Sequence, residues 1–473
     1  MKVIDSLYIN GQWQKAHGND TVLVTNPATE QTCVSIPKGD KVDVNAAVSA
    51  ARHALPGWSA TTAQHRAELM LAVACEMENR YQDLIDAHME TMGCPRHLAG
   101  DLHVDAAIEG MRYYASQAHI MDQVEERGEV LILKEAVGVC AFINPWNYPL
   151  HQLIGKVAPA LAAGCTIIAK PAEQTPLQDL IMAEIFHKVG LPAGVFNLVF
   201  GSGREIGPLM SNHPQVDMVS FTGSTAAGIQ VATAAAPTVK RVCQELGGKS
   251  ALIITEDADL AAAIRYGVED VMTNSGQTCN ALTRMYLPAS RYQEAVSLAQ
   301  DIVQEQKVGD PQNETVTMGP LASKRQQETV LQFIRQGVDE GARLIAGGAD
   351  MPTGLEKGAY VRPSIFADVT QEMSIAREEI FGPVLCMLAY DNIEQAIEMA
   401  NDSVYGLSSG VYAKDKVSAL KIARRLQAGQ CYIQGSYFNM NAPFGGYKQS
   451  GNGREWGKEA LHEYVETKAI ICG

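Results

Sequence analysis

Cys279 is the residue whose surroundings are most typical of a nucleophile. It ends the run Asn274-Ser-Gly-Gln-Thr-Cys279, in which polar residues and a glycine precede the thiol and no second ligand stands at metal-binding spacing. The thiolate rather than the thiol attacks carbon, so such a cysteine needs a nearby base or dipole. The competing interpretation is a small buried hydrophobe, the usual state of cysteine. We expect that inert state for Cys75, Cys140 and Cys165, which lie in apolar runs.

Five polar loops, each following a short apolar run, form the second group of chemical interest. They begin at Asn144, Lys170, Gly201, Thr222 and Cys243, and read NPWNYP, KPAEQTP, GSGREIG, TGSTAAG and CQELGGK. If the apolar runs are parallel strands, these loops lie beyond the carboxyl ends of the strands, where such sheets bind ligands. One glycine-rich turn is usually only a turn, but five such loops in strand order predict a dinucleotide site.

Single residues in these loops suggest how a dinucleotide would be held. Glu173 is placed to accept hydrogen bonds from ribose hydroxyls, and Lys170 suits the same hydroxyls or a phosphate. Ser224 precedes a predicted helix whose N-terminus would face a pyrophosphate. A carboxylate at Glu173 repels a 2′-phosphate, so the sequence favours NAD, with NADP as the alternative. The eleven histidines form no cluster with metal-ligand spacing, and no metal is expected.

The elements that must position these loops alternate between strands and helices. A strand-like opening (Leu7 to Trp13), a helical region (43–118) and a strand-like run (128–137) come first. Short apolar runs then alternate with helical stretches in two series, over 137–255 and 248–442, the second with helices near 291–305, 323–341, 393–400 and 416–427. Because each parallel return needs a crossover helix, the pattern predicts an α/β fold with two doubly wound parallel sheets.

Composition narrows the class of protein. The chain has 473 residues, of which 46% are hydrophobic and 19% charged, enough for two or three domains. A net charge of −15 argues against a nucleic-acid partner. The opening residues have no apolar signal run, and no stretch reaches the roughly 18 apolar residues that would span a membrane. With ten scattered cysteines, the sequence predicts a soluble cytoplasmic protein with reduced thiols.

The chain resembles the aldehyde dehydrogenase superfamily from about Leu7 to Ile471. The resemblance rests on seven motifs in the family order, Pro145-Trp-Asn147, Lys170-Pro-Ala-Glu173, Phe221-Thr-Gly-Ser-Thr225, Glu245-Leu-Gly-Gly-Lys249, Gly276-Gln-Thr-Cys279, Glu379-Ile-Phe-Gly-Pro383 and Pro443-Phe-Gly-Gly446. It implies an NAD-binding domain (1–120 and 138–246), a catalytic domain (247–445) and a small β oligomerisation element (121–137 and 463–473). A homodimer or homotetramer is expected, without a nucleic-acid or membrane partner.

The resemblance also implies a role for each residue of the centre. Cys279 would add to an aldehyde, Asn147 would hold the resulting oxyanion, and Glu245 would activate the water that hydrolyses the thioester. Without the motifs, Asn147 could equally cap the following helix, and Glu245 could be a surface acid at a strand end. The cofactor-binding residues implied are Ile143, Pro145, Trp146, Lys170, Glu173, Gly203, Gly207, Phe221, Thr222, Gly223, Ser224, Leu246, Glu379 and Phe381.

A substrate pocket follows from the same motif spacing. Its expected lining is Tyr148, Gln152, Gly155, Thr278, Asn280, Phe438 and Phe444, with Ala106 and Thr273 beside them. Gly155 and Thr273 are small where many family members have a large aromatic residue, so we expect a wide, partly polar pocket for a bulky or polar aldehyde. Betaine-aldehyde or semialdehyde specificity is an alternative. So are a cysteine-dependent esterase or thioesterase without redox turnover, a coenzyme A-acylating enzyme, which Glu245 argues against, and a catalytically inactive binding protein.

Overall fold

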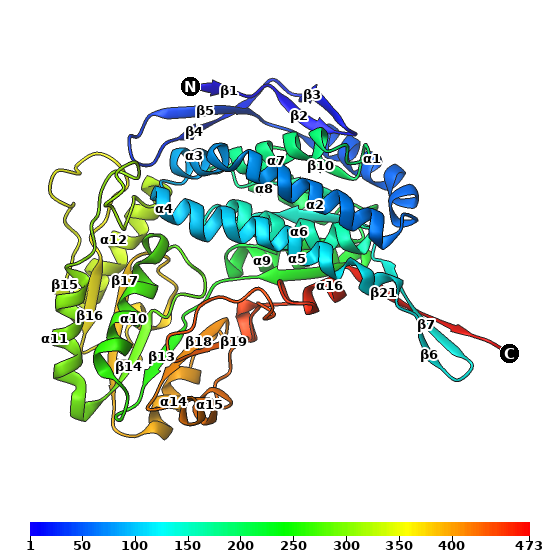
Figure 1. Cartoon of the computed structure of the whole chain (residues 1–473). Coiled ribbons are helices and arrows are strands. Elements are labelled where there is room, and N and C mark those ends of the chain that lie inside the picture. Colours follow the sequence, from blue (N-terminus) through cyan, green and yellow to red (C-terminus); the bar gives the residue numbers. More distant parts are fainter.

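Two large sheets, each covered by helices, and a thin arm that projects from one end make up the fold (Figure 1). The structure is a computed structural model and describes residues 1–473. No helix in it is long and apolar enough to cross a membrane.

The first sheet has eight strands, of which the central five are parallel. Its strands in spatial order are β20 (Gly451–Asn452), β12 (Arg241–Glu245), β11 (Met218–Thr222), β8 (Val139–Ile143), β9 (Thr166–Lys170), β10 (Phe196–Leu198), β2 (Ser6–Ile9) and β3 (Gln12–Lys15). Its helices are α1 (Lys41–Ser59), α2 (Ala63–Asn79), α3 (Tyr81–Thr91), α4 (Arg96–Leu98), the π-helix η1 (Ala99–Asp105), α5 (Ala106–Gln117), α6 (Pro149–Ala163), α7 (Leu177–Lys188), α8 (Gly203–Ser211), α9 (Thr225–Ala235) and α16 (Glu459–Glu463).

The second sheet has seven strands, six of them parallel. In spatial order they are β15 (Arg343–Ala346), β16 (Ser364–Ala367), β17 (Val384–Tyr390), β14 (Arg284–Pro288), β13 (Ala251–Ile254), β18 (Ser408–Tyr412) and β19 (Gln430–Ile433). Its helices are α10 (Leu260–Met272), α11 (Tyr292–Val303), α12 (Lys324–Asp339), α13 (Ser374–Arg377), α14 (Ile393–Asn401) and α15 (Lys416–Ala423). The expected pair of doubly wound sheets is therefore confirmed.

Two smaller sheets complete the chain. One joins β1 (Lys2–Val3), β5 (Thr32–Pro37) and β4 (Thr21–Thr25). The other is the projecting arm, in which β21 (Val465–Ile471) pairs with β7 (Val130–Ala136) and β7 with β6 (Glu125–Arg127), all antiparallel (Figure 1). The C-terminal strand thus finds its partner more than 300 residues earlier in the chain.

Helix α6 links the first sheet to the chemistry. Its fifteen residues are all buried, as expected for a helix that is apolar on every side. Pro149 opens it, and Gly164 ends it in the left-handed conformation with φ +87°. The rigid start of this helix places the segment Pro145–Tyr148 at the carboxyl end of β8.

Two local expectations were wrong. The expected strand from Leu7 to Trp13 is a hairpin of β2 and β3, because Asn10 and Gly11 adopt positive φ and form a two-residue turn. Cys75 is exposed rather than buried, although Cys140 and Cys165 are buried as expected. In α2 the residues that face the core are three or four apart, and Cys75 falls on the opposite face.

Candidate active site

The nucleophile loop leaves α10 through an unusual turn. Asn274, Ser275 and Gly276 all adopt the left-handed conformation, and the Ser275 hydroxyl donates to the Gly319 carbonyl at 2.9 Å. A side chain at Gly276 would put its Cβ 2.1 Å from the Gly382 carbonyl carbon, so only glycine fits there. The turn brings half-buried Cys279 to the wall of a cavity that is described below.

Asn147 lies beside this loop. Its side-chain amide donates to the Gln277 carbonyl at 2.9 Å, and the Asn274 amide donates to the Asn147 carbonyl at 3.0 Å. Helix α6 begins after Tyr148 and has no side-chain cap, so Asn147 is not a helix cap. An amide has two N–H groups, so one donor of Asn147 is left for another acceptor.

Glu245 ends β12 and is buried, with 4% of its surface exposed, so it is not a surface acid. Its Oε2 atom has no hydrogen-bond partner, and a Cβ on Gly445 would lie 2.8 Å from Oε1. Burial, followed by the charge of Glu455, raises the pKa of Glu245 well above its usual range. Its surroundings thus favour the protonated form of Glu245 more than water would.

A buried lysine near Glu245, which sequence reasoning missed, affects the pKa of that carboxyl. Lys156 of α6 is fully buried, and its Nζ atom lies 2.7 Å from Glu455 Oε1 and 2.7 Å from Thr222 Oγ1. The Lys156 charge lowers the pKa of Glu245, opposing the effect of Glu455. A lysine inside an otherwise apolar helix was the one available signal, because lysine is rarely buried without a partner. Glu455 stands in no motif.

All but two of the expected cofactor residues lie at or near the carboxyl ends of the strands of the first sheet; Glu379 and Phe381 belong to the second sheet. The parallel register pairs Ile143 with Lys170 and with Phe221, and Thr222 with Glu245, so the carboxyl ends of these strands are level. Pro145 and Trp146 follow β8 at this edge. Gly203 opens α8, Gly207 lies one turn further along it, and Gly223 precedes Ser224. Leu246 follows β12.

Hydrogen bonds define the ribose end of this edge. The Glu173 carboxylate accepts from the Gly203 amide at 3.1 Å, which links the second and third loops. Lys170 is buried rather than an ordinary surface lysine, and burial lowers its pKa to about 8. Ser224 caps α9 by accepting from the Ala227 amide at 3.3 Å. Carboxylate, amine and helix N-terminus therefore occur in the order that a ribose and a pyrophosphate require.

The second sheet contributes the opposite wall. Glu379 accepts from the Gly248 amide at 2.9 Å, and burial raises its pKa to about 7. The Phe381 ring packs edge-on against Trp146 with centroids 5.3 Å apart. Gln326, which sequence reasoning missed, donates to the Phe381 carbonyl at 2.9 Å and fixes this loop. The two walls thus meet across the carboxyl ends of the first sheet.

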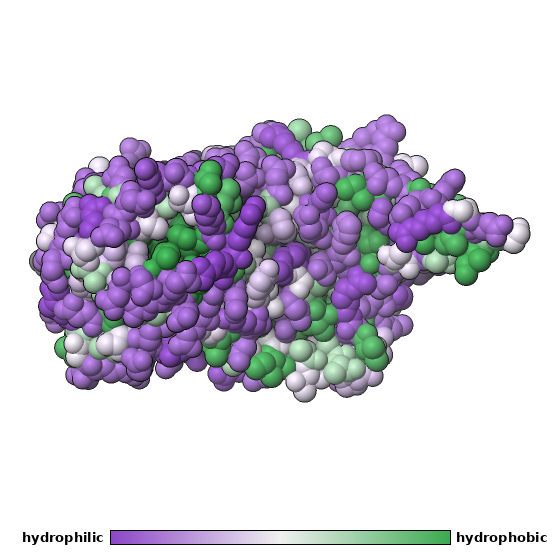
Figure 2. All heavy atoms as spheres, turned by 90° about the horizontal axis from the view of Figure 1, so that it is seen from below, coloured by the Kyte–Doolittle hydropathy of each residue, from purple (hydrophilic) through white to green (hydrophobic).

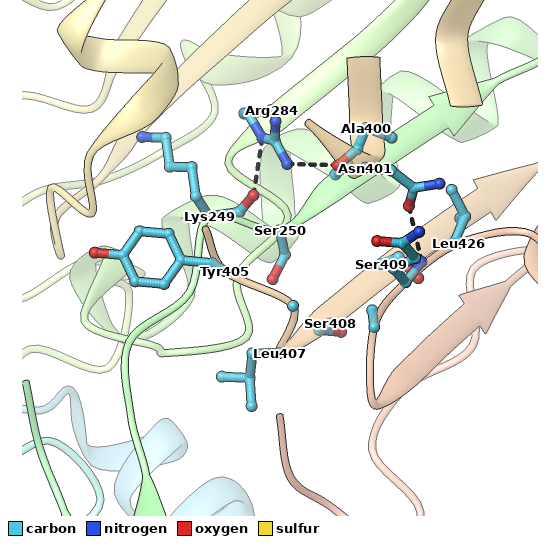
Figure 3. Close-up of a pocket in the computed structure, with 14 residues that line it drawn as sticks. Lys249, Ser250, Arg284, Ala400, Asn401, Tyr405, Leu407, Ser408, Ser409 and Leu426 are labelled. Carbon is cyan, nitrogen blue, oxygen red and sulfur yellow. Dashed lines mark hydrogen bonds between the residues drawn. The ribbon is translucent and has the colours of Figure 1, made fainter. Parts of the chain in front are cut away.

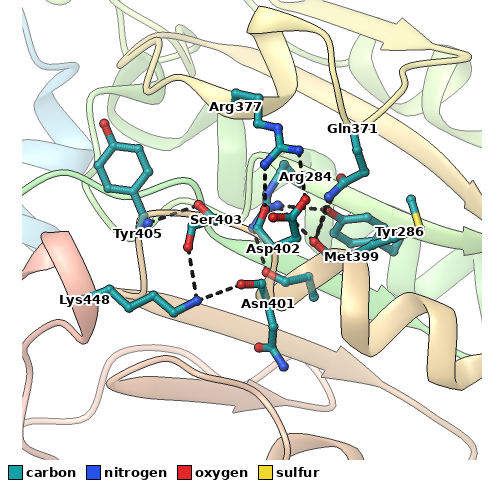
Figure 4. Close-up of polar contacts among 11 residues, drawn as sticks. Arg284, Tyr286, Gln371, Arg377, Met399, Asn401, Asp402, Ser403, Tyr405 and Lys448 are labelled. Carbon is teal, nitrogen blue, oxygen red and sulfur yellow. Dashed lines mark hydrogen bonds and ion pairs between the residues drawn. The ribbon is translucent and has the colours of Figure 1, made fainter.

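A cluster of hydrogen bonds to backbone carbonyls fixes the segments next to the site. Arg284 donates to the carbonyls of Lys249 and Ala400 and lines a void of about 10 Å³ (Figure 3). In the same region, Lys448 donates to the Asn401 carbonyl at 2.7 Å (Figure 4). Two residues on, Ser450 donates to the Gly247 carbonyl at 2.7 Å. These bonds hold the segment that follows Glu245. The void has room for about one water molecule and is no substrate site.

The substrate side is a cavity of about 540 Å³ whose wall includes Cys279. Tyr148 hydrogen-bonds to Thr278 at 2.9 Å, and Asn280 donates to Tyr432 at 3.2 Å. The expected lining residues found there are Tyr148, Gln152, Thr278, Asn280, Phe438 and Phe444, with Ala106 and Thr273.

Gly155 is the exception, and the expected role for it was wrong. It does not line the cavity, because the Trp456 indole packs against it, so that a Cβ on Gly155 would lie 3.0 Å from Trp456 Cζ2. Trp456 itself lines the cavity. The space that a side chain at position 155 would occupy is therefore filled by the indole ring of Trp456, which lies near the C-terminal end of the chain.

Comparison with known proteins identifies the family. The model of the aldehyde dehydrogenase family matches residues 13–470. The chain belongs to the aldehyde dehydrogenase family. It is 48% identical to a 3-succinoylsemialdehyde-pyridine dehydrogenase of Pseudomonas sp over 472 residues, which is 100% of this chain and 99% of the relative.

Solved structures of other aldehyde dehydrogenases have the same fold. A variant of aldehyde dehydrogenase C from Pseudomonas syringae, in complex with NAD+ and octanal, superposes with a TM-score of 0.97 at 45% identity, covering 99% of this chain and 96% of that one. A Mycobacterium tuberculosis aldehyde dehydrogenase in complex with NAD+ gives 0.97 at 40% identity, covering 100% and 99%. The family resemblance seen in the sequence is confirmed.

The Asn147 amide gives a first testable prediction for this aldehyde dehydrogenase. If the Asn147 amide donates to an oxygen anion that forms at Cys279, Asn147→Ala removes that donor, and loss of one such donor costs about 2.7–4 kcal/mol. We expect kcat to fall by about 10²–10³ in a steady-state NADH assay. Asn212→Ala, an exposed position at the end of α8, is the control and should leave kcat unchanged. A loss of less than tenfold in Asn147→Ala would show that another group holds the oxyanion.

Proposed function

We propose that this protein oxidises an aldehyde to the carboxylic acid with NAD as hydride acceptor, through a thioester on Cys279. Membership of the family supports the oxidation, and the NAD+ complexes of its structural neighbours support the cofactor. The observation on which the proposal rests is that Asn147, Glu245 and Cys279 lie near one another. The Asn147 amide bonds within the nucleophile loop, and the buried Glu245 lies close enough to Cys279 for its charge to raise the pKa of the thiol.

The chemistry of the residues follows from their surroundings. Burial, with the charges of Glu379, Glu245 and Glu455, raises the pKa of Cys279, so the thiol must lose its proton before it attacks the aldehyde carbon. Asn147 then stabilises the oxygen anion of the tetrahedral adduct. NAD, when bound, accepts the hydride that leaves the same carbon. The thioester that remains on Cys279 is ready for attack by water.

Glu245 supplies the second half of the reaction. In its ionised form it takes a proton from water, whose oxygen attacks the thioester carbon and releases the acid and the thiol of Cys279. The orphaned Oε2 atom of Glu245 leaves one acceptor free for that water. Release by hydrolysis rather than by transfer to coenzyme A is therefore the proposed outcome.

The preferred cofactor and the preferred aldehyde are each inferred from one or two observations. The Glu173 carboxylate next to Gly203 favours the free ribose hydroxyls of NAD over the phosphate of NADP, which is the alternative. The names of two relatives point to different aldehydes, one a semialdehyde that carries a pyridine ring and one octanal. A cavity of about 540 Å³ accepts either, and we propose a bulky or polar aldehyde.

The proposed domain division follows the two large sheets and the arm. Residues 1–120 with 138–246 would bind NAD, 247–445 would carry the nucleophile, and 121–137 with 463–473 would join subunits. Strand β20 pairs with β12, so the segment after 445 returns to the first sheet. We also propose a cytoplasmic location, which the ten free cysteines favour.

The arm supports a homodimer or homotetramer. Ile470 and Ile471 of β21 are exposed, and Figure 2 shows hydrophobic side chains gathered where the arm projects from a mostly hydrophilic surface. Such a strand with free edges is a ready site for pairing with another subunit. A second copy of the chain is the proposed occupant.

The first test is whether Cys279 supports NADH production. The purified protein is mixed with NAD and a panel of aldehydes, and absorbance of NADH is recorded. We expect turnover by the wild type and none by Cys279→Ala, because the covalent adduct cannot form. Cys75→Ala, which removes an exposed thiol, is the control and should retain turnover. No NADH with NAD or NADP, together with hydrolysis of a simple ester, would support the esterase alternative instead.

A second test separates the two half-reactions. Glu245→Gln should release about one NADH per subunit in a burst and then turn over about 10²–10⁴ times more slowly, because water is no longer activated. In the wild type, the steady-state rate should rise with pH, since the raised pKa of Glu245 keeps it protonated in mildly acidic solution. Rapid-mixing absorbance measures both phases. A slow rate without a burst would place Glu245 before hydride transfer.

A third test concerns the arm. The double variant Leu131→Asp and Ile470→Asp places two charges at paired positions of β7 and β21. If the arm joins subunits, light scattering after size exclusion should show a shift toward the monomer mass of 51.0 kDa. Thr467→Asp, an exposed position on β21, is the control. An unchanged oligomer mass in the double variant, or a monomeric wild type, would contradict the proposal.

A further inference from the structure

A buried carboxylate that no motif includes lies beside the proposed cofactor edge. Asp179 stands in the first turn of α7 and is fully buried. Its Oδ1 atom accepts from the Asn144 side-chain amide at 3.3 Å, and its Oδ2 atom has no hydrogen-bond partner. The Asn144 backbone amide donates to the Lys170 carbonyl at 3.0 Å. Asp179 is therefore connected through one residue to the end of β9, where Lys170 stands.

An acid in this position is costly to keep, because burial disfavours a charge that no cation compensates. The amide that contacts Asp179 is neutral, so no cation compensates its charge at contact distance. Burial raises the pKa of Asp179 to about 7, while the hydrogen bond from Asn144 and the charges of Lys170 and Lys156 oppose that rise. The carboxyl group therefore loses its proton close to neutral pH.

The Lys170 side chain ends where the ribose of the cofactor is expected. Its Cε atom lies 3.9 Å from the place that a Cβ on Gly203 would take, and the Gly203 amide is the group that donates to Glu173. The Nζ atom donates to the carbonyl of Pro171, which is neutral. Burial lowers the pKa of Lys170 to about 8, and the charges of Glu173 and Asp179 oppose that fall. The ammonium thus depends on two carboxylates.

The two carboxylates lie in different surroundings. Glu173 is half-buried and stands in the loop that would bind the ribose hydroxyls, whereas Asp179 is shielded from solvent by the fold. A charge in a buried region is screened little, so Asp179 acts on Lys170 over a longer distance than a surface acid would. The charged form of Lys170 is important for binding, because a hydrogen bond from an ammonium is about twice as strong as a neutral one.

We propose that Asp179 is a positioning residue for the cofactor, which keeps Lys170 charged from the buried side so that its ammonium donates to a ribose hydroxyl of NAD. The inference rests on the proposed function and adds to it a residue that does not itself touch the cofactor. Without the carboxylate, Lys170 would lose its proton at a lower pH, and NAD would lose a charge-assisted hydrogen bond in the range where the enzyme works.

The test follows the dissociation constant of NAD against pH, measured by calorimetry on the whole enzyme without aldehyde. In the wild type, we expect binding to weaken as the pH rises through the Lys170 pKa of about 8, because the ammonium loses its proton. In Asp179→Asn, which keeps an acceptor for Asn144, the same weakening should occur about one pH unit lower. Glu379, on the opposite wall, titrates in both proteins and does not produce a difference between them.

Further variants assign the shift to the pair of residues. In Lys170→Arg the side chain stays charged at every pH used, so adding Asp179→Asn should leave its pH dependence unchanged. Asp179→Glu, which keeps the charge, should return the midpoint toward that of the wild type. Asp43→Asn is the control, because Asp43 is also a buried acid in the first turn of a helix, α1, and should leave the midpoint in place.

The outcomes separate this inference from the proposed function. A wild-type curve with no change near pH 8, or an unchanged midpoint in Asp179→Asn, would overturn the inference and leave the dehydrogenase intact. Weaker binding by the same factor at every pH would also overturn it, since Asp179 would then serve only the fold. Asp179→Ser is a second neutral variant, to be used if Asp179→Asn does not fold. Failure to bind NAD at any pH, with no NADH from any aldehyde, would overturn the proposed function as well.

Discussion

The close approach of the two large sheets at glycine residues is the constraint on which the site depends. A Cβ on Gly248 would lie 2.5 Å from the Cys279 carbonyl oxygen, and one on Gly276 would meet the Gly382 carbonyl. Side chains at these positions would push the segment after Glu245 away from the nucleophile loop. Backbone contact in this region therefore keeps Glu245, which ends a strand of the first sheet, near the loop of Cys279, as the proposed mechanism requires. Such reactions lose rate steeply when reacting groups are displaced by about 1 Å.

Close packing also sets the protonation of the carboxyl group of Glu245. Burial and the nearby charge of Glu455 disfavour ionisation of Glu245, and the charge of the buried Lys156, which pairs with Glu455, opposes that effect. Removing Lys156 and Glu455 from water costs free energy, so their attraction stabilises the fold only if the geometry of the pair is good. Lys156 also contacts Thr222, whose strand ends at the proposed cofactor edge. One ammonium group thus links the substrate helix α6, the cofactor edge and the general base.

The sequence predicted those parts of the fold that depend on local pattern. Strand and helix bounds such as Leu177–Lys188 were found because apolar periodicity reports burial directly. Asn147, Glu245 and Cys279 were singled out because each stands in a local motif. Lys156 and Glu455 were not, because their contacts exist only after distant segments meet. The filling of the space at Gly155 by Trp456 is the clearest example, since a small residue implied room that tertiary packing removes.

The proposed catalytic groups and the charge of the cavity wall are supplied by different kinds of element. The three side chains proposed for catalysis stand at or after strand ends and after a tight turn, where register and packing leave little freedom. An acidic wall of the cavity stands instead on a π-helix, Ala99–Asp105, followed by α5. Asp101 and Asp105 lie four residues apart, close to one turn of such a helix, so both stand near one face of it. These two residues and Cys279 line the same cavity from different elements, so the charge of this wall does not depend on the turn that holds Cys279.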